Sequence, residues 1–142
     1  MGNMYAAQVR VRYADTDAMG IAYHANYLVW FEVGRTEFMR ARGVEYAKLE
    51  AAGFMLPVVE AQIHWRHPAR YDDLIDIETS LAELTPARIR FAYRIRRHED
   101  GQLLCEGSTL HGFVTREGKP VAMPRRAPEL YRRLEALVGA SV

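Results

Sequence analysis

Residues 13–27, YADTDAMGIAYHANY, bring together side chains that can do acid–base or nucleophilic chemistry. Asp15 and Asp17 stand two residues apart, Gly20 and His24 follow, and a strongly apolar segment begins directly afterwards. A carboxylate beside the start of a helix can act as a nucleophile or as a general base. The unpaired N–H groups of the helix start can stabilise negative charge on a substrate oxygen. The stretch therefore contains the groups that a reaction with a developing oxyanion would use.

The same residue types also have a purely structural interpretation. Asp and Asn side chains accept hydrogen bonds from backbone N–H groups in turns and at helix N-termini. Asp15, Asp17 or Asn26 would then be turn or capping residues, and Gly20 would supply the flexible position of the turn. The spacing alone leaves both interpretations open.

A long central helix is predicted directly after this stretch, over residues 25–43. Aromatic and apolar residues recur there at helical spacing, and Gly43 supplies a stop. Leu28, Val29 and Val33 make the first half of the helix apolar almost all round. We therefore expect this half to be buried on most sides.

Strands are predicted on both sides of the helix. Apolar and basic residues alternate over residues 5–13, which indicates a half-buried strand that ends near Ala14. The later elements are a short helix at residues 45–53, strands at 56–67, 73–84, 88–97 and 103–116, and an amphipathic helix at 128–138.

This order predicts an α+β fold: a curved antiparallel sheet of about five strands wrapped around one central helix. Consecutive strands with short turns favour antiparallel pairing, and a helix apolar on most faces needs a sheet to enclose it. We expect a single domain over residues 1–142. Because one sheet covers only one side of the helix, we also expect a second subunit, or sheet extension through an edge strand.

Composition argues against several classes of function. The chain has 19 basic and 18 acidic residues, a net charge of +1, which does not favour nucleic acid or an anionic membrane as partner. Cys105 is the single cysteine, so neither an internal disulfide nor a Cys-x-x-Cys metal site is expected, and we expect no cofactor. No apolar run approaches the roughly 20 residues that span a bilayer, and no signal-peptide pattern is found, which favours a cytoplasmic protein.

Residues 13–32, YADTDAMGIAYHANYLVWFE, resemble the signature of the 4-hydroxybenzoyl-CoA thioesterase family of hotdog-fold proteins, and in particular its YbgC-like acyl-CoA thioesterase branch. Residues 67–79, HPARYDDLIDIET, resemble the family's segment leading into its third strand. The resemblance covers roughly residues 7–124. It implies a hotdog fold and hydrolysis of an acyl-CoA thioester to a carboxylic acid and free coenzyme A.

The resemblance also implies roles for individual residues. The family's catalytic carboxylate, the second aspartate of the signature, falls on Asp17. The signature glycine falls on Gly20, and the backbone N–H groups around Tyr23 and His24 would hold the thioester carbonyl oxygen. We take Asp17 and His24 as catalytic candidates, and Gly20, Tyr23 and Asn26 as substrate-binding candidates. The benzoyl-CoA enzymes carry tyrosine where His24 stands, which argues against a hydroxybenzoyl substrate and for the broader acyl-CoA group.

Other acidic residues have mainly structural interpretations. Asp15 is expected to tie the turn together. Glu32 and Glu37 lie on the central helix, where a carboxylate serves as the base in other hotdog branches. Arg35 stands three residues after Glu32, which favours a structural ion pair there.

The histidines and arginines of the strands are weaker candidates. His64 and His67 lie three apart, which places them on opposite faces of a strand, so a metal site is not expected. His111 is interpreted as a hydrogen-bonded sheet residue. The arginine row at 88–97 is interpreted as a solvated sheet face, with a clamp for the phosphates of coenzyme A as the alternative.

Two alternatives to hydrolysis stay open at this point. One is a protein that binds acyl thioesters of coenzyme A or acyl carrier protein without cleaving them. The other is a hotdog hydratase or dehydratase, although the usual motif of those branches is lacking. In each case we expect a homo-oligomer, either a dimer or a dimer of dimers (a homotetramer).

Overall fold

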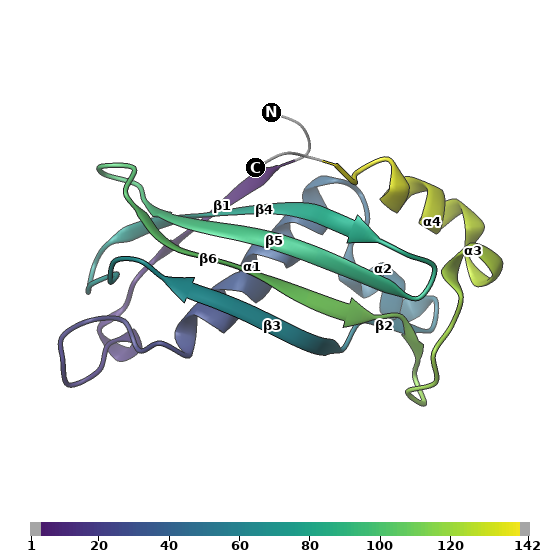
Figure 1. Cartoon of the computed structure of the whole chain (residues 1–142), viewed down its shortest axis with the longest axis horizontal. Helices are drawn as coiled ribbons and strands as arrows, with labels where there is room; N and C mark the ends of the chain where they lie inside the picture. Colours follow the sequence, from purple (N-terminus) through teal and green to yellow (C-terminus); the bar gives the residue numbers. More distant parts are fainter. Residues whose placement is uncertain (1–3, 140–142) are drawn as a thin grey trace.

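The computed structural model describes residues 4–139 and shows a five-stranded antiparallel sheet with one long helix packed across it (Figure 1). The strands lie in the order β1 (Tyr5–Arg10), β4 (Leu74–Leu84), β5 (Arg88–Arg97), β6 (Leu103–Gly112) and β3 (Val58–Trp65). The helices are α1 (Asn26–Ala41), α2 (Tyr46–Ala51), α3 (Met123–Arg126) and α4 (Pro128–Glu135), and β2 (Phe54–Met55) pairs separately with β7 (Val114–Thr115). The predicted α+β architecture is confirmed.

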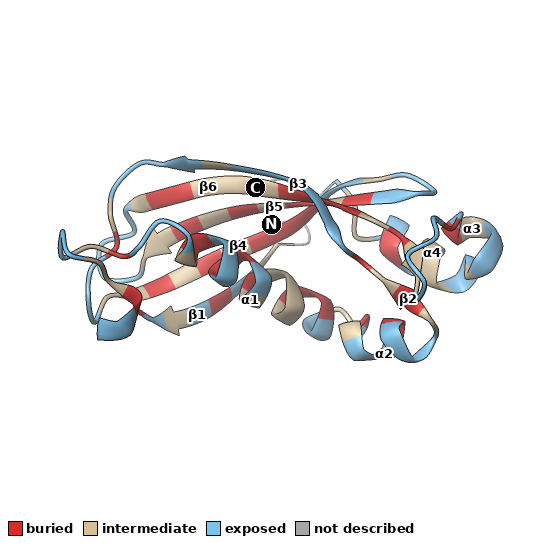
Figure 2. Cartoon of the chain, turned by 90° about the horizontal axis from the view of Figure 1, so that it is seen from below, coloured by how far each residue is buried: buried red, intermediate tan, exposed pale blue. Residues whose placement is uncertain are grey.

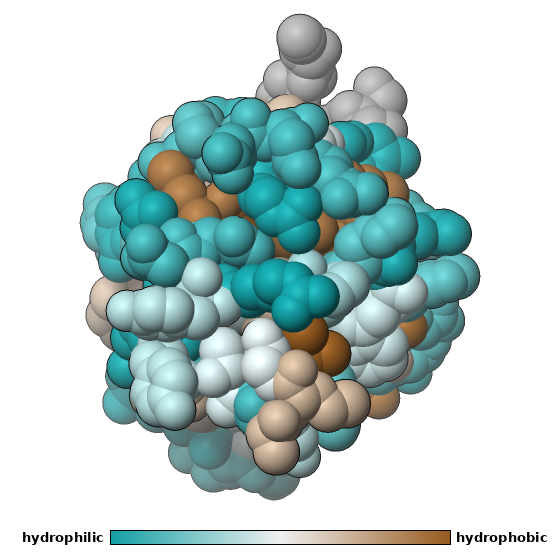
Figure 3. All heavy atoms as spheres, turned by 90° about the vertical axis from the view of Figure 1, so that its left-hand side faces the viewer, coloured by the Kyte–Doolittle hydropathy of each residue, from teal (hydrophilic) through white to brown (hydrophobic). Residues whose placement is uncertain are grey.

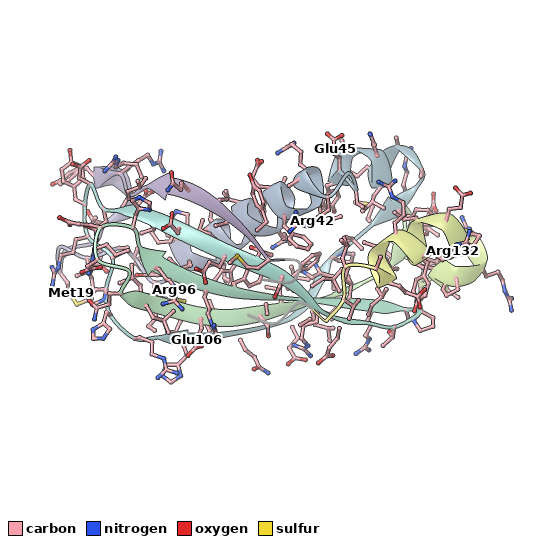
Figure 4. All side chains as sticks on the ribbon, turned by 90° about the horizontal axis from the view of Figure 1, so that it is seen from above. Met19, Arg42, Glu45, Arg96, Glu106 and Arg132 are labelled. Atoms are coloured by element: carbon pink, nitrogen blue, oxygen red, sulfur yellow. The ribbon has the colours of Figure 1, made fainter. Side chains whose placement is uncertain are left out.

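The two faces of the sheet differ because the side chains of β4 and β5 alternate in polarity. The inner face is fully buried and contributes Ile75, Ile77, Leu81, Ile89, Phe91, Tyr93 and Ile95. The opposite face carries ion pairs such as Arg96 with Glu78, whose Nε and Oε2 atoms are 3.3 Å apart. Arg96 and Glu106 project from this face, away from α1 (Figure 4). The core therefore lies between the inner face and α1.

Helix α1 lies unusually close to the sheet at Gly34. A Cβ atom at this position would stand 2.5 Å from Oγ1 of Thr79 and 2.6 Å from Cγ2 of Ile77. Only glycine allows this approach, although glycine costs about 1 kcal/mol relative to alanine in a helix interior. One turn earlier, Phe31 stacks on Tyr93 with ring centroids 4.2 Å apart. These contacts fix where α1 crosses the sheet.

Two sequence-based expectations about the first third of the chain are wrong in detail. β1 ends at Arg10, opposite Leu74, and a short 3₁₀ helix, Tyr13–Asp15, follows where the strand was expected to continue. Leu28 and Val29 are 43% and 54% exposed rather than buried. The first half of α1 thus keeps an uncovered apolar side, because the sheet of one chain covers only the opposite side.

The C-terminal helix is shorter than expected and ends at Glu135, with the additional turn α3 before it. Seen from below (Figure 2), exposed residues follow almost the whole length of β3, the last strand of the sheet. Within residues 4–139 no helix has the length and apolar character needed to cross a membrane.

A buried chain of hydrogen bonds crosses β5 and β6 beneath α1. His111 Nδ1 lies 2.9 Å from the carbonyl oxygen of Leu56, and its Nε2 lies 2.8 Å from Oγ1 of Thr109. A carbonyl oxygen only accepts, so Nδ1 carries the proton and Nε2 accepts from the Thr109 hydroxyl. The Tyr93 hydroxyl, 2.6 Å away, then donates to Thr109. His111 is thus a hydrogen-bonded sheet residue, as its position in the sequence indicated.

This burial makes stability depend on pH. Desolvation, aided by the nearby positive charge of Arg35, lowers the pKa of His111 from 6.5 to about 4. The folded state therefore binds this proton more weakly than the unfolded state, and stability that is complete above pH 6.5 is lost as pH falls toward 4. We expect this loss to be on the order of 3 kcal/mol. It can be measured as the free energy of urea unfolding between pH 4 and 7.

His111→Gln removes the titrating group while its amide can still donate to the Leu56 carbonyl oxygen. The slope of the unfolding free energy against pH is proportional to the number of protons that bind on unfolding, and this number should fall by up to one in this variant. The slope should stay unchanged in His64→Gln, which alters an exposed histidine. Equal slopes in wild type and His111→Gln would contradict the prediction.

Candidate active site

The segment between β1 and α1 is a tight reversal of the chain. The Asp17 N–H donates to the Ile21 carbonyl oxygen at 2.9 Å, and Thr16 and Ala22 form an antiparallel bridge. The N–H of Gly20 donates to the Asp17 carbonyl oxygen at 2.9 Å, and Gly20 has a φ of +79°, which an L side chain rarely adopts. The reversal projects from one end of the molecule, where Met19 is labelled in Figure 4.

Asp17 stands at the start of this reversal, partly exposed. Its Oδ1 accepts a hydrogen bond from the backbone N–H of Met19 at 2.8 Å. Within residues 4–139, no hydrogen bond is made by its Oδ2. The turn therefore orients the carboxylate through one oxygen and leaves the other available for a reaction.

Asp15 has a different environment, although it is only two residues away. It is 6% exposed, and Oδ1 lies 2.8 Å from Nη2 of Arg12 while Oδ2 accepts the Arg12 backbone N–H at 2.8 Å. The hydrogen bond from the Arg12 side chain is the main cause that lowers the pKa of Asp15. Its carbonyl oxygen accepts from the Tyr23 N–H at 2.8 Å and from Nδ2 of Asn26 at 2.7 Å. Asp15 therefore ties the end of β1 to the start of α1.

The start of α1 offers backbone donors. Ala25 is the N-cap residue, and no side chain caps the helix there. The Tyr23 N–H is already used by Asp15, whereas the N–H groups of His24 and Ala25 have no hydrogen-bond partner among residues 4–139. The free donors thus begin at His24, one residue later than the first position that the resemblance implied.

The candidate residues taken from the sequence therefore lie in one region of the structure, but each makes different contacts. Asp17, Gly20 and His24 surround the reversal, while the Asn26 side chain is used to hold Asp15. The His24 ring packs edge-on against Trp65 at the end of β3, with centroids 6.0 Å apart. Trp65 was not identified from the sequence, because no local sequence pattern connects β3 to this turn.

The carboxylates of α1 lie outside this arrangement. Glu37 pairs with Arg40, and Glu32 is exposed. Arg35, which we expected to pair with Glu32, lies instead beside Tyr93. Burial raises the pKa of the Tyr93 hydroxyl, and the positive charge of Arg35 offsets part of this rise. In the part of the chain that the structure describes, no group of three or more His, Cys, Asp or Glu residues is placed to hold a metal ion.

Comparison with known proteins supports the resemblance seen in the signature. The model of the thioesterase-like superfamily matches residues 11–134. The acyl-CoA thioesterase YbgC of Haemophilus influenzae is 33% identical over 138 residues, covering 95% of this chain and 99% of that protein. The acyl-CoA thioester hydrolase YbgC of Escherichia coli is 35% identical over 118 residues, covering 82% of this chain and 87% of that protein.

A solved structure agrees with this relationship. The DHNA-CoA thioesterase from Staphylococcus aureus superposes with a TM-score of 0.86 at 30% identity, covering 94% of this chain and 92% of that one. The predicted hotdog fold is thereby confirmed. With a family match over most of its length, the chain belongs to the thioesterase-like superfamily, and its relatives include enzymes of the YbgC type.

Proposed function

We propose that this protein, acting as one hotdog domain over residues 1–142, hydrolyses acyl-CoA thioesters to a carboxylic acid and free coenzyme A. One observation carries the proposal: the Asp17 carboxylate, oriented by the Met19 N–H, lies on the short turn that leads into a helix start whose His24 and Ala25 N–H groups are unpaired among residues 4–139. The names of the relatives at 33–35% identity support the same activity.

The chemistry of a thioester suits these groups. Its leaving group is a thiol with a solution pKa of about 8.5, so the enzyme needs no strong general acid. It needs a nucleophile or a base, and a place for the charge that builds on the carbonyl oxygen as the carbon becomes tetrahedral. Asp17 supplies the first, and the N–H groups and dipole at the start of α1 supply the second.

Two paths use Asp17 through the same free oxygen. In the covalent path, Oδ2 attacks the thioester carbon, the C–S bond breaks to release the thiolate of coenzyme A, and water then hydrolyses the mixed anhydride. In the general-base path, Asp17 takes a proton from a water molecule as that water attacks. The partial exposure of Asp17 leaves room for water on either path. His24 contributes its backbone N–H to the carbonyl oxygen and its ring to the wall beside it.

A homodimer, alone or as half of a tetramer, is the assembly that the exposed surface favours. β3 is an edge strand with an unpaired side, and a strand edge of this length is normally covered in native proteins. It carries exposed Val58 and Val59, and α1 exposes Leu28 and Val29. A second copy of the chain would pair with the edge and cover apolar residues at once.

The catalytic assignment predicts the effect of Asp17→Asn. The amide oxygen can still accept the Met19 N–H, so the turn and the unfolding midpoint should be preserved. Hydrolysis should fall by about 100-fold or more, because an amide neither attacks a thioester nor accepts the proton of water. Release of thiol from a panel of acyl-CoAs, measured beside wild type, tests this.

Glu32→Gln is the matched control, because it makes the same chemical change on the exposed side of α1. It should hydrolyse like wild type. Wild-type rates in Asp17→Asn would overturn the assignment. If wild type binds acyl-CoA but releases no thiol from it or from acyl carrier protein thioesters, the protein is a binding module, and a hydroxyacyl product would indicate a hydratase.

The assembly proposal predicts a molar mass of at least twice the 16.3 kDa of one chain in light scattering after size-exclusion chromatography. Val59→Asp places a charge on the open edge and should shift the population toward monomer, whereas Glu117→Ala, in an exposed turn, should not. A wild-type monomer at millimolar concentration would contradict the proposal.

A further inference from the structure

The loop between β3 and β4, residues 66–73, binds the reversal between β1 and α1 on both sides. Val11, directly after β1, exchanges two backbone hydrogen bonds with residues 72–73, at 2.9 and 2.8 Å. On the other side of the reversal, the Ala22 N–H donates to the Ala69 carbonyl oxygen at 2.8 Å. The reversal therefore lies between two attachments to one loop.

Arg97, at the end of β5, reaches this loop with its side chain. Its Nε lies 3.3 Å from Oδ2 of Asp73, and its Nη2 donates to the Pro68 carbonyl oxygen at 3.2 Å. Its Nη1 donates to Oδ2 of Asp100 at 3.0 Å and to Oε1 of Gln102 at 3.2 Å, both between β5 and β6. The planar fork of a guanidinium suits several acceptors in fixed directions. One side chain therefore joins the loop to the β5–β6 turn.

These segments lie at one end of the molecule. In Figure 1 the β5–β6 turn, the loop after β3 and the reversal all stand on the left. Figure 3 looks onto this end, where hydrophilic residues cover most of the upper half and the lower half is paler and includes a hydrophobic patch. The side chains of Arg97 and Asp73 are only 17% and 20% exposed. Water and salt screen their ion pair less than they screen a pair on the open surface.

The loop connects Arg97 to the candidate site through Ala69, the residue after Pro68. Ala69 is fully buried, and its N–H donates to the Tyr27 hydroxyl oxygen at 3.2 Å. Its carbonyl oxygen accepts the Ala22 N–H. Ala69 therefore joins the reversal to the first turn of α1, next to the helix start that offers the free N–H donors. A shift of the loop would move the reversal relative to these donors.

The loop needs support because one of its residues has an unfavourable backbone conformation. Asp72 has a φ of +70°, in the left-handed region, which costs free energy for any residue except glycine, although Asp tolerates it better than most. The next residue, Asp73, accepts the Arg70 N–H on Oδ2 at 2.9 Å, the same oxygen that Arg97 contacts. The carboxylate thus closes the loop around Asp72, and Arg97 holds the carboxylate in place.

We propose that Arg97 is a positioning residue for the reaction: its guanidinium holds loop 66–73, and the loop holds the reversal that carries Asp17 against the start of α1. The inference rests on the proposed thioesterase function and adds a residue to it. Because Arg97 acts through the loop, its removal should disturb the orientation of the reacting groups more than the binding of substrate.

The test measures kcat and KM of Arg97→Gln and Arg97→Lys on the acyl-CoA that wild type cleaves fastest, well below the unfolding midpoint of each variant. Arg97→Gln should lower kcat about 30-fold and leave KM within about twofold of wild type, because the reacting groups lose their alignment and no substrate contact is removed. Arg97→Lys keeps the charge without the fork, so its kcat should lie between those of wild type and Arg97→Gln.

Arg96, the preceding residue, supplies the matched control. Its Nε lies 3.3 Å from Oε2 of Glu78, and its Nη1 donates to the Gly101 carbonyl oxygen at 3.3 Å. Arg96 thus makes an ion pair of the same length and contacts the same β5–β6 turn, but none of its hydrogen bonds or ion pairs among residues 4–139 goes to the loop. Arg96→Gln should keep kcat and KM within about twofold of wild type.

Three results would overturn the inference and leave the thioesterase function intact. They are a folded Arg97→Gln with wild-type kcat, a loss that appears in KM alone, and an equal loss of kcat in Arg96→Gln. If Arg97→Gln does not fold, Asp73→Ala, which removes the loop's side of the ion pair, takes its place with the same outcomes.

If wild type cleaves no thioester, the proposed function fails instead, and hydrogen exchange of backbone amides decides whether Arg97 holds the reversal. The Val11 and Ala22 amides should exchange about tenfold faster in Arg97→Gln than in wild type, whereas the Tyr93 amide in the middle of β5 should not change. Faster exchange that is absent from Arg96→Gln supports the inference. Unchanged exchange, or the same increase in both variants, overturns it.

Discussion

The hydrogen bonds of Asp15 hold the candidate site together. Its carboxylate binds the backbone and side chain of Arg12, two residues after the end of β1, and its carbonyl oxygen accepts from Tyr23 and Asn26, at the start of α1. One buried residue thus joins two elements that run in different directions. Both ends of the reversal are thus held by the hydrogen bonds of Asp15. The position of Asp17 relative to the helix start follows from this connection.

The packing of α1 sets the other boundary of the site. Glycine at position 34 brings the helix against Ile77 and Thr79, and the stacking of Phe31 on Tyr93 fixes its neighbouring turn. With the helix held along its length, its first turn comes to lie beside the end of β3. Trp65 reaches Tyr27 and His24 only because of this crossing. These contacts of Trp65 are therefore a product of tertiary packing, whereas the turn that carries Asp17 is largely local.

This difference explains what the sequence could predict. β5 follows its alternation almost throughout, because a period of two reports directly on burial. β4 follows it only as far as Thr79: Ser80, expected on the outer face, is buried together with Leu81, next to a register shift between Leu81 and Glu83. The turn was recognisable because its residues are contiguous. The exposure of Leu28 and Val29 was not predictable from a local pattern, since it depends on how much of α1 one sheet covers. The two-residue strands β2 and β7 are too short to show any period, and the contact between Trp65 and His24 joins segments about 40 residues apart.

The surroundings of Asp15 and Asp17, and not the residue type, distinguish the two carboxylates in the proposed reaction. Both oxygens of Asp15 are bound by Arg12, so attack by either would require breaking this ion pair and the hydrogen bond from the Arg12 backbone N–H. Asp17 is held by one backbone N–H through Oδ1, which is enough to orient it without occupying Oδ2. The hydrogen bonds that hold Asp15 thereby also set the position of Asp17, two residues later. That division leaves one free, oriented carboxylate oxygen on the turn that leads to the unpaired helix N–H groups, and the proposed thioester cleavage relies on this combination.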